Sequence, residues 1–449
     1  MPNLPSDILS ILIPFANIFV LQKTFSKALV LMIGALLCRT GVTVCSSLRA
    51  VGLSTEKCFS RYHRLLNRDR WNLFAGAKIL LLLLLRYFNQ GLTLTFAIDD
   101  TLERRRGKHI RAKGWFKDPI QSANGKVATS SGLRWMPVML LTVVPFIGRI
   151  FALPFLTVLV PSEKRQRELG LRHRSPQKRA SQVVCLLRRW FPLFSLRLVV
   201  DAGYACIELA RQCIRKHMTL ITRLRANARL FEFAPAKTGK RGRPRKKGKR
   251  LNLQEKAANL TWVRHKIKGY GGIEELRDLA DFVCLWAPMG GGEPIRVRIV
   301  LSKDPMDPKE RLFALLTTDM AIASKEVLEL YTIRWKQEVT HREVREHLGM
   351  ETQRQWSDSA IERTTPLIFA LYSLTFVIGS HLNSLSPLQA ARSAWYSKEG
   401  LTFSDLLHAV RRVLREHLFS RVLAADPILQ KLPLSKELLQ AVLRLAEAA

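Results

Sequence analysis

The chain alternates between helix-like and strand-like patterns of hydrophobic residues. Residues 1–90 carry apolar side chains at helical spacing, and Ser324–Leu348 and 360–449 do so again. From Leu92 onward, short apolar runs bounded by Gly, Pro and Asp are typical of strands. Three strands, a helix, a strand, a helix and a strand follow one another there, which predicts a mixed α/β sheet with flanking helices.

The individual elements of this region have clear ends in the sequence. The predicted strands are Leu94–Ile98, Trp135–Pro145, Arg149–Pro161, Leu196–Val200 and Thr219–Leu224, and the predicted helices are Ser175–Phe191 and Ile207–His217. Phe146-Ile147-Gly148 separates the second and third strands, so we expect these two to form a hairpin.

The stretch Thr43–Asn67 predicts two helices joined at Gly52-Leu53, with Ser54 as the N-cap of the second. That second helix carries Arg61 and Arg64, with Lys57 near its start. The pattern is compatible with a helix-turn-helix that binds DNA. Two packed helices with a solvated basic face explain it equally well.

Three strongly apolar runs near the N-terminus raise the question of a membrane. They are Ser10–Phe19, Ala28–Leu37 and Ile79–Leu85, and each is shorter than the roughly 20 residues of a spanning helix. No basic segment precedes the first, so we expect neither a membrane span nor a secretory signal. The seven cysteines include no CxxC pair, which favours reduced thiols in a cytosolic protein.

Charge indicates the partner. The sequence has 72 Lys and Arg against 36 Asp and Glu, a net charge of +36, while its hydrophobic content of 47% is ample for large cores. Such an excess favours a polyanion, and nucleic acid binding would then be strong and sensitive to salt.

The segment Lys237–Arg250 is rich in Gly, Pro and basic residues, and we expect a disordered loop because it has nothing to bury. Its centre, Arg241-Gly242-Arg243-Pro244, resembles the core of a minor-groove AT-hook. A loop that grips phosphates without sequence preference is the other interpretation.

Two predicted strands end in aspartate, one at Asp99-Asp100-Thr101 and the other at Asp201. Ligand-binding residues of open α/β sheets lie at the carboxyl ends of strands, and carboxylates there suit Mg²⁺. In so basic a chain, acidic residues facing DNA require cations between them and the phosphates, and two metal ions would meet that need. Each aspartate taken alone is more typical of a turn or cap after a strand, and only its combination with the next motif favours a metal ligand.

A third motif strengthens this interpretation. On one continuous helix, Tyr331, Arg334, Glu338 and Arg345 share a narrow stripe, because their offsets of 3, 7 and 14 residues correspond to roughly 300°, 340° and 320°. Two arginines and a tyrosine around one carboxylate favour a phosphate clamp beside a metal ligand. A solvated amphipathic face is the alternative.

These residues resemble a known family. The chain is similar to the DDE transposases with a ribonuclease H-like fold, in particular the insertion-sequence-four superfamily, over roughly residues 90–350. That superfamily has a Tyr-x2-Arg-x3-Glu-x6-Lys signature, which Tyr331, Arg334 and Glu338 match, while Arg345 replaces the lysine. A planar guanidinium fork thereby stands where a point charge is usual.

The resemblance implies a catalytic site. Asp100, Asp201 and Glu338 would be the catalytic residues and the ligands of two Mg²⁺ ions, for which Mn²⁺ would substitute. We choose Asp100 over Asp99 because strand alternation places Asp99 on the other face. The expected DNA contacts are Tyr331, Arg334, Arg345, Arg104, Arg105, Arg106, Lys108, Arg241, Arg243 and Arg245.

The expected organisation is a ribonuclease H-like sheet with flanking helices, a β-rich insertion and helical ends. Its parts are a helical DNA-binding region at 1–90, the first part of the core at 91–224, the insertion at 225–290, the second part of the core at 291–355 and a helical region at 356–449. Within the insertion, Trp262 and Trp286 either stack on an extruded base or pack in the core.

The resemblance therefore implies a transposase that cleaves and joins DNA at insertion-sequence ends in a metal-dependent reaction. Its partners would be double-stranded DNA, at transposon ends and target, and a second copy of the chain in the synaptic complex. We expect it in the bacterial cytoplasm, associated with the nucleoid when it binds DNA. A non-catalytic DNA-binding derivative of a transposase and a structural RNA-binding protein are the alternatives.

Overall fold

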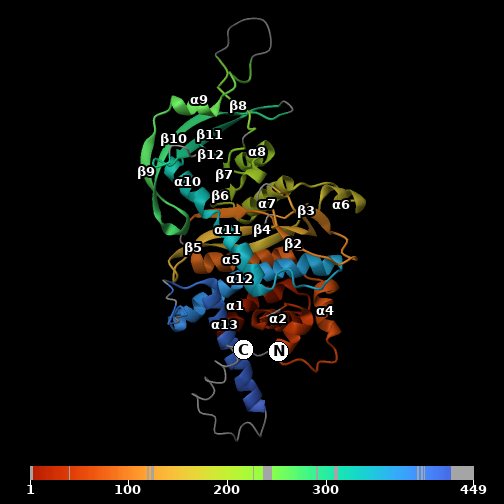
Figure 1. Cartoon of the computed structure of the whole chain (residues 1–449). Coiled ribbons are helices and arrows are strands. Elements are labelled where there is room, and N and C mark those ends of the chain that lie inside the picture. The colour runs from red at the N-terminus through yellow and green to blue at the C-terminus, as the bar shows by residue number, and fades with distance from the viewer. Residues whose placement is uncertain are drawn as a thin grey trace.

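The computed structural model describes residues 4–425 except for 40, 90, 119–120, 123–125, 226, 236–244, 290–291, 308–311, 392–393, 396–397 and 399. Within this part of the chain the strands form one mixed sheet of twelve strands. A layer of helices from both ends of the chain lies under one part of the sheet, and the strands of the middle segment extend away from it (Figure 1).

The strands are β1 (Thr93–Ile98), β2 (Thr101–Arg104), β3 (Gly114–Lys117), β4 (Thr129–Val144), β5 (Arg149–Leu159), β6 (Ser195–Val200), β7 (Met218–Arg223), β8 (Leu230–Phe231), β9 (Val263–Lys268), β10 (Glu274–Trp286), β11 (Ile295–Lys303) and β12 (Phe313–Thr317). The helices are α1 (Ser6–Leu12), α2 (Gln22–Leu37), α3 (Val44–Ala50), α4 (Ser60–Asn67), α5 (Leu73–Phe88), α6 (Glu163–Glu168), α7 (Pro176–Trp190), α8 (Ile207–Arg215), α9 (Leu253–Ala258), α10 (Ser324–Ile333), α11 (Lys336–Leu348), α12 (Asp358–Leu385) and α13 (Phe403–Ala425). Short 3-10 turns are η1 (Ile13–Ile18), η2 (Ala202–Tyr204) and η3 (Tyr270–Gly272).

The core of the sheet has the ribonuclease H-like arrangement that the sequence predicts. Its five strands lie in the order β5-β4-β1-β6-β7, where β5, β4 and β1 are antiparallel neighbours and β1, β6 and β7 are parallel. The crossover helices α7 and α8 connect β5 to β6 and β6 to β7. The predicted fold class is confirmed.

The sequence of the parallel strands explains their place at the centre. Phe96, Ala97 and Ile98 of β1 are fully buried, and so are the last three residues of β6. Parallel strands covered on both faces need continuous apolar runs. Because these runs stop at Ile98 and Val200, the aspartates that follow leave the sheet at its carboxyl edge.

The predicted hairpin is present as β4 and β5, which pair in antiparallel register from Trp135 with Leu159 to Val144 with Arg149. Its turn uses Gly148 at a φ of 72°, a left-handed conformation that glycine adopts without a steric penalty.

The β-rich segment continues the core sheet instead of forming a separate unit. β12 pairs with β7 of the core, and β11 and β10 follow in the same sheet. The β10–β11 hairpin joins residues on both sides of position 290, where the sequence suggested a boundary. The amino-acid composition does not reveal this pairing, because polar and apolar residues alternate in the same way in β10 and in β11.

Part of the predicted disordered loop at 237–250 is ordered. The N–H of Glu232 donates to the carbonyl of Lys249 at 2.9 Å, and the N–H of Gly248 donates back to Glu232 at 2.9 Å. These backbone bonds hold the second arm of the loop beside β8. Arg241 and Arg243 lie outside the described residues.

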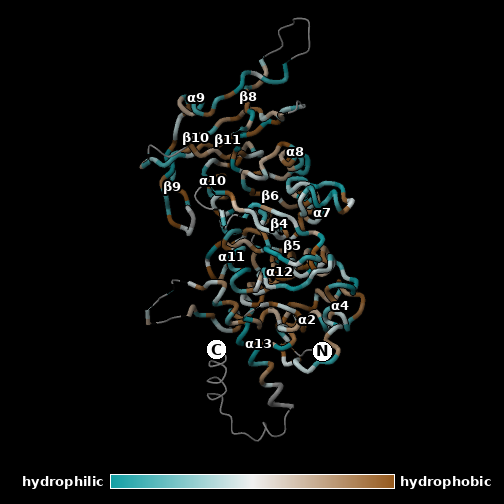
Figure 2. The backbone as a smooth tube through the Cα atoms, turned by 45° about the vertical axis from the view of Figure 1, so that its right-hand side comes forward, coloured by the Kyte–Doolittle hydropathy of each residue, from teal (hydrophilic) through white to brown (hydrophobic). Residues whose placement is uncertain are grey.

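The two ends of the chain pack together under the sheet. α12 lies against β5, α5 and α13. The guanidinium of Arg411 on α13 donates to the carbonyls of Leu36 and Cys38 at the C-terminal end of α2, at 2.6 and 2.8 Å. Hydrophobic stretches gather in this layer and in the sheet, whereas α7 is largely hydrophilic (Figure 2). The regions 1–90 and 356–449 thus form one layer.

α3 and α4 differ from the predicted helix pair. α3 is capped by Thr43, whose side chain accepts from the N–H of Ser46. The second helix starts at Ser60 and not after Ser54, because the carboxylate of Glu56 accepts from the N–H of Cys58 at 2.7 Å and holds a turn there. Arg61 and Arg64 remain on this helix, whereas Lys57 precedes it.

Among the described helices, α12 is long and apolar enough to cross a membrane by length and composition. However, 72% of its apolar stretch is buried inside the protein, against the sheet and the neighbouring helices. Its apolar character is accounted for by this position.

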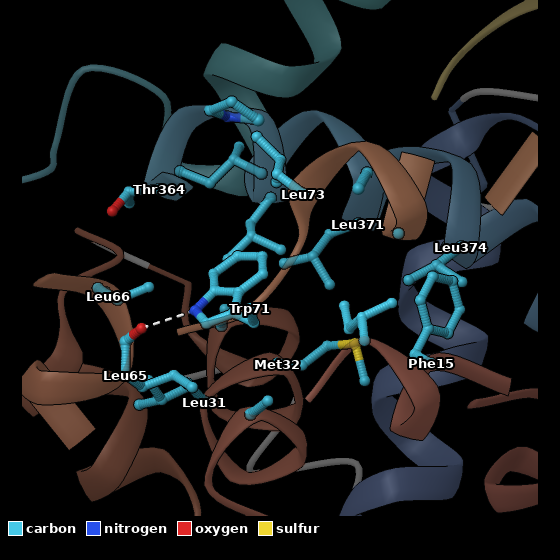
Figure 3. A pocket seen from close by; sticks show the side chains of 18 of the residues that line it. Phe15, Leu31, Met32, Leu65, Leu66, Trp71, Leu73, Thr364, Leu371 and Leu374 are labelled. Carbon is cyan, nitrogen blue, oxygen red and sulfur yellow. Dashed lines mark hydrogen bonds between the residues drawn. The ribbon is translucent and has the colours of Figure 1, made fainter. Parts of the chain in front are cut away.

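A cavity of about 160 Å³ lies within the helical layer. Apolar side chains of η1, α2, α5 and α12 line it, among them Phe15, Met32 and Leu371 (Figure 3). Trp71 reaches into its wall and donates its Nε1–H to the carbonyl of Leu65 at 2.8 Å.

Candidate active site

Three separate segments bring carboxylates to the carboxyl edge of the parallel strands. Asp99 and Asp100 follow β1, Asp201 follows β6, and Glu338 lies in the first turn of α11. Ile98 and Val200 are paired in register, so Asp99 and Asp201 are the next residues on neighbouring strands. Parallel strands lie roughly 4.8 Å apart, and this topology therefore makes the two aspartates neighbours.

The carboxylate of Asp99 has two partners. Its Oδ1 accepts from the N–H of Asp100 at 2.8 Å, and its Oδ2 lies 3.5 Å from Nη1 of Arg334. Burial, followed by the charge of Asp201, raises its pKa to about 7, and the charge of Arg334 opposes the rise. The positive charge of Arg334 therefore does not offset the effects of burial and of the neighbouring aspartates on the pKa of Asp99.

Asp100 is more exposed and has different partners. Its Oδ2 lies 3.1 Å from Nε of Arg134 on β4, and its Oδ1 accepts from the hydroxyl of Tyr204 at 3.3 Å. Its side chain is 32% exposed, against 19% for Asp99. Burial raises the pKa of Asp100, Arg134 lowers it, and Asp201 raises it further.

β1 ends at Ile98, so the alternation of faces along a strand does not extend to Asp99 and Asp100. The choice of Asp100 over Asp99 therefore remains a prediction that strand alternation alone does not decide. The charge of Asp201 raises the pKa of both aspartates, and both carboxyl groups therefore share its electrostatic environment.

Glu338 joins this environment from the opposite side. Its Oε1 lies 3.7 Å from Nη2 of Arg334. Burial raises the pKa of Glu338, the charge of Arg334 lowers it, and that of Asp201 raises it. One guanidinium thus contacts both Asp99 and Glu338, and it links the first aspartate segment to the glutamate helix.

The single helix predicted for Ser324–Leu348 is interrupted. α10 ends at Ile333 and α11 begins at Lys336. Between them, backbone N–H groups donate to the carbonyl three residues earlier, as in a 3-10 turn. The N–H of Gln337 donates to the carbonyl of Arg334 and that of Glu338 to the carbonyl of Trp335, both at 3.0 Å. Neither Arg334 nor Trp335 is a helix breaker, so no residue type in this segment indicates the tighter turn.

The break divides the predicted stripe. Tyr331 on α10 stays beside Arg334, whose guanidinium carbon lies 5.3 Å from the centre of its ring. Arg345, near the other end of α11, instead donates from Nη2 to the hydroxyl of Thr101 and to the carbonyl of Leu102, the latter at 3.0 Å. Tyr331, Arg334 and Glu338 are brought together, and Arg345 lies elsewhere.

The basic residues after β1 also differ in exposure. Arg104 pairs with Asp118 at 2.7 Å, and Arg105 is buried against Glu103 at 2.7 Å. Arg106 and Lys108 are exposed, as is Arg245 beyond β8. Only the exposed residues present their charge freely toward solvent, whereas the first two are neutralised within the protein.

Three residues at the site were not identified from the sequence. Arg134 and Tyr204 contact Asp100. With its amide oriented so that the oxygen faces the end of β1, the fully buried Gln337 accepts from the N–H groups of Asp99 and Ile98 at 3.1 and 3.3 Å. A cation inside the apolar run of β4 was the one available signal for Arg134. The other two are ordinary residues next to predicted ligands.

Trp262 and Trp286, the two aromatic candidates of the β-rich segment, are involved in packing. Trp286 is 7% exposed. Trp262 donates its Nε1–H to the carbonyl of Ala257 at 3.1 Å, and the ammonium of Lys303 lies 4.3 Å from the centre of its ring.

The carboxylates of this site are chemically suited to bind a divalent cation. They are hard oxygen donors, and burial with mutual repulsion raises the pKa of Asp99, Asp100 and Glu338, which a cation would relieve. In the described part of the chain, no three His, Cys, Asp or Glu side chains are grouped closely enough to hold an ion as they lie. Arg134 and Arg334 lie against the carboxylates instead.

Comparisons with known proteins find a matching family and a similar solved structure. The family described as DDE superfamily endonuclease matches residues 14–274, more than half of the chain. No curated protein sequence matches the chain. Among solved structures, the chain is similar to the piggyBac transposase in a synaptic complex with hairpin DNA, determined by cryo-EM, at 14% identity and a TM-score of 0.42. The alignment covers 98% of this chain and 81% of that one.

Proposed function

The chain belongs to the DDE superfamily endonucleases, and we propose that it is a transposase that cleaves DNA at the ends of an insertion sequence and transfers the freed strand to a target. The observation that carries the proposal is the convergence of Asp100, Asp201 and Glu338 from two parallel strands and one helix on a single edge of the sheet. Three carboxylates in one electrostatic environment form an unusual arrangement in a chain of net charge +36.

Asp100, Asp201 and Glu338 are the proposed ligands of two Mg²⁺ ions, with Mn²⁺ as a substitute. Metal ions held by such carboxylates activate the attacking oxygen and stabilise the leaving oxygen of a phosphodiester. The carboxylates must be ionised to serve as ligands. Arg334 favours the ionised forms of Asp99 and Glu338, because its charge lowers the pKa of both.

Arg334 and Tyr331 are the proposed phosphate contacts nearest to the carboxylates. Nε of Arg334 is buried and has no hydrogen-bond partner among the described residues, so the protein does not satisfy all the donors of this guanidinium. Arg106, Lys108 and Arg245 are exposed and would attract the DNA backbone. Such contacts give affinity without sequence preference.

A homodimer that brings two DNA ends together belongs to the same proposal, as does a place in the bacterial cytoplasm. The alternative is a DNA-binding protein without catalysis. Two ion pairs favour this alternative, Arg134 with Asp100 and Arg334 with Glu338. A guanidinium that occupies a carboxylate competes with a metal ion for the same oxygens.

The substitution Glu338→Gln separates the two functions, because it removes the charge of the proposed ligand and keeps its shape. The substrate is a duplex that carries the DNA bordering the coding sequence, incubated with Mg²⁺ or Mn²⁺. We expect the wild type to cleave it and the variant to bind it with similar affinity but leave it intact. Glu346→Gln is the matched control, since Glu346 is exposed on the same helix. Binding without metal-dependent cleavage by the wild type would support the alternative.

A further inference from the structure

Four charged side chains form a network at the end of α11, away from the carboxylates. Nε of Arg345 lies 3.5 Å from Oε1 of Glu351, whose Oε2 lies 3.3 Å from Nη1 of Arg104, and Nε of Arg104 lies 2.7 Å from Asp118. Two positive and two negative charges balance one another. Carboxylates of the same chain therefore neutralise Arg104 and Arg345.

Arg345 also holds the backbone next to a proposed ligand. Its Nη2 donates to the hydroxyl of Thr101, the residue directly after Asp100, and to the carbonyl of Leu102 at 3.0 Å. Its other side faces Glu351. Only a planar fork with donors on two edges makes both sets of contacts, which a lysine ammonium does not reproduce.

The backbone of Glu351 supports a constrained role. Its φ is 78°, in the left-handed region that residues other than glycine rarely adopt. Its carboxylate accepts from the N–H of Arg104 at 3.2 Å, and its own N–H donates to the side chain of Gln353 at 3.0 Å. Strained conformations of this kind persist where surrounding contacts hold them in place.

A second contact holds the other end of the same segment. Gln337, next to Glu338, accepts from the N–H groups of Ile98 and Asp99. α11 is therefore fastened to residues 98–104 at both ends, by Gln337 near its start and by Arg345 and Glu351 near its finish. The segment that carries Asp100 and the helix that carries Glu338 are joined between these contacts.

We propose that Arg345 is a positioning residue, which acts with Glu351 to fix Asp100 relative to Glu338, and that it does not hold DNA phosphate. This inference rests on the proposed function, because it assigns these two carboxylates to one metal site. The competing role is a contact with DNA phosphate. The two roles predict opposite effects for the variants Arg345→Lys and Glu351→Gln.

The test compares Arg345→Lys, Arg345→Gln, Glu351→Gln and the double variant Arg345→Gln/Glu351→Gln. Arg342→Gln is the control, because Arg342 is exposed on the same helix. DNA affinity is measured by fluorescence anisotropy over a range of salt concentrations. The cleavage rate is measured on the end-bearing duplex. Backbone order is measured by hydrogen exchange of residues 98–104 in each folded variant.

If Arg345 is a positioning residue, Arg345→Lys and Glu351→Gln both slow cleavage by roughly 10–100-fold, the usual cost of losing a partner of a metal ligand. DNA affinity and its salt dependence stay as in the wild type. Exchange at residues 98–104 becomes faster, and the double variant is no slower than the worse single variant, because both changes break one network.

A phosphate contact gives the contrary result. Arg345→Lys then retains cleavage, Arg345→Gln weakens DNA binding and reduces the slope of log affinity against log salt by about one, and Glu351→Gln tightens binding. Either that pattern or unchanged exchange at residues 98–104 overturns the inference. The exchange measurement needs no cleavage, so an inactive wild type would contradict the proposed function and leave the positioning role to be decided by exchange alone.

Discussion

Ile98 and Val200 are the last paired residues of the parallel strands β1 and β6, and the residue after each is an aspartate. This relationship places Asp99, not Asp100, beside Asp201 in the topology of the sheet. Both aspartates have protein partners at both carboxylate oxygens, but the side chain of Asp100 is 32% exposed, against 19% for Asp99. We therefore propose that Asp99 anchors Arg334 and that Asp100 binds the metal.

The first prediction compares Asp99→Asn with Asp100→Asn. Loss of the anchor should slow metal-dependent cleavage by roughly 10–100-fold, as removal of a partner of a ligand does. Loss of Asp100 should have a larger effect, because it removes the ligand itself. Cleavage rates of the two variants on one duplex decide between them, and a greater defect in Asp99→Asn would reverse the assignment.

The sequence is informative about strands and their ends for a physical reason. An apolar run that stops at aspartate marks both a buried strand and a polar edge, so the ends of β1 and β6 and the hairpin of β4 and β5 could be predicted. The same logic marked Asp201, whereas Glu338 was predicted from the helical stripe and the family resemblance.

Contacts between distant positions were not predictable in this way. Arg345 contacts Thr101 and Arg104 contacts Glu351 across most of the core, and single-sequence patterns carry no information on such pairs. The break between α10 and α11 was hidden for another reason, since Arg334 and Trp335 are both compatible with a helix interior. Glu338 and Arg345 both lie on α11, so it is the contacts of Arg345 with Thr101 and Glu351, and not the break, that hold its guanidinium away from the carboxylates.

The second prediction concerns the buried charge of Glu103. This carboxylate is fully buried and accepts from Arg105 at 2.7 Å, from Nε1 of Trp135 at 2.6 Å and from Thr365 at 2.8 Å. Glu103→Gln leaves the guanidinium of Arg105 without its charge partner and should cost about 3–5 kcal/mol of the free energy of unfolding.

Chemical denaturation measures this cost, and Glu103→Leu combined with Arg105→Met is the matched control. The double replacement leaves no unpaired charge and should be less destabilised than the single variant. Equal stability of Glu103→Gln and the wild type would show that Arg105 finds another partner.

The third prediction uses His341, which is buried on α11. Burial, with the charges of Arg345 and Arg334, lowers the pKa of His341 to about 3 from an ordinary value of 6.5. Below pH 6.5 the unfolded chain takes up a proton that the folded state excludes, so stability falls as pH decreases from 6.5 toward 3. His341→Leu removes this contribution. Its free energy of unfolding should decline less steeply than that of the wild type over this range, and parallel curves would exclude the mechanism.

The fourth prediction contrasts two glycines inside helices. A Cβ on Gly76 of α5 would lie 3.3 Å from a methyl of Ile18 at the edge of the cavity, whereas one on Gly34 of α2 would lie 2.2 Å from the carbonyl oxygen of Ser47. Alanine favours a helix interior over glycine by about 0.5–1 kcal/mol. Gly76→Ala should therefore raise the melting temperature and Gly34→Ala lower it, because the methyl of Ile18 can move and the backbone of α3 cannot. Changes of the same sign would contradict this account of the helical layer.

The central claim, that three carboxylates on one edge of the sheet cut DNA, is tested most directly by mapping cleavage on the DNA that borders the coding sequence. The measurement locates the 3′-hydroxyl ends produced by the wild type and by Asp201→Asn in the presence of Mg²⁺. We expect defined 3′-hydroxyl ends for the wild type, their loss in the variant, and unchanged DNA binding by both. Cleavage by Asp201→Asn at the same positions and at the wild-type rate would contradict it.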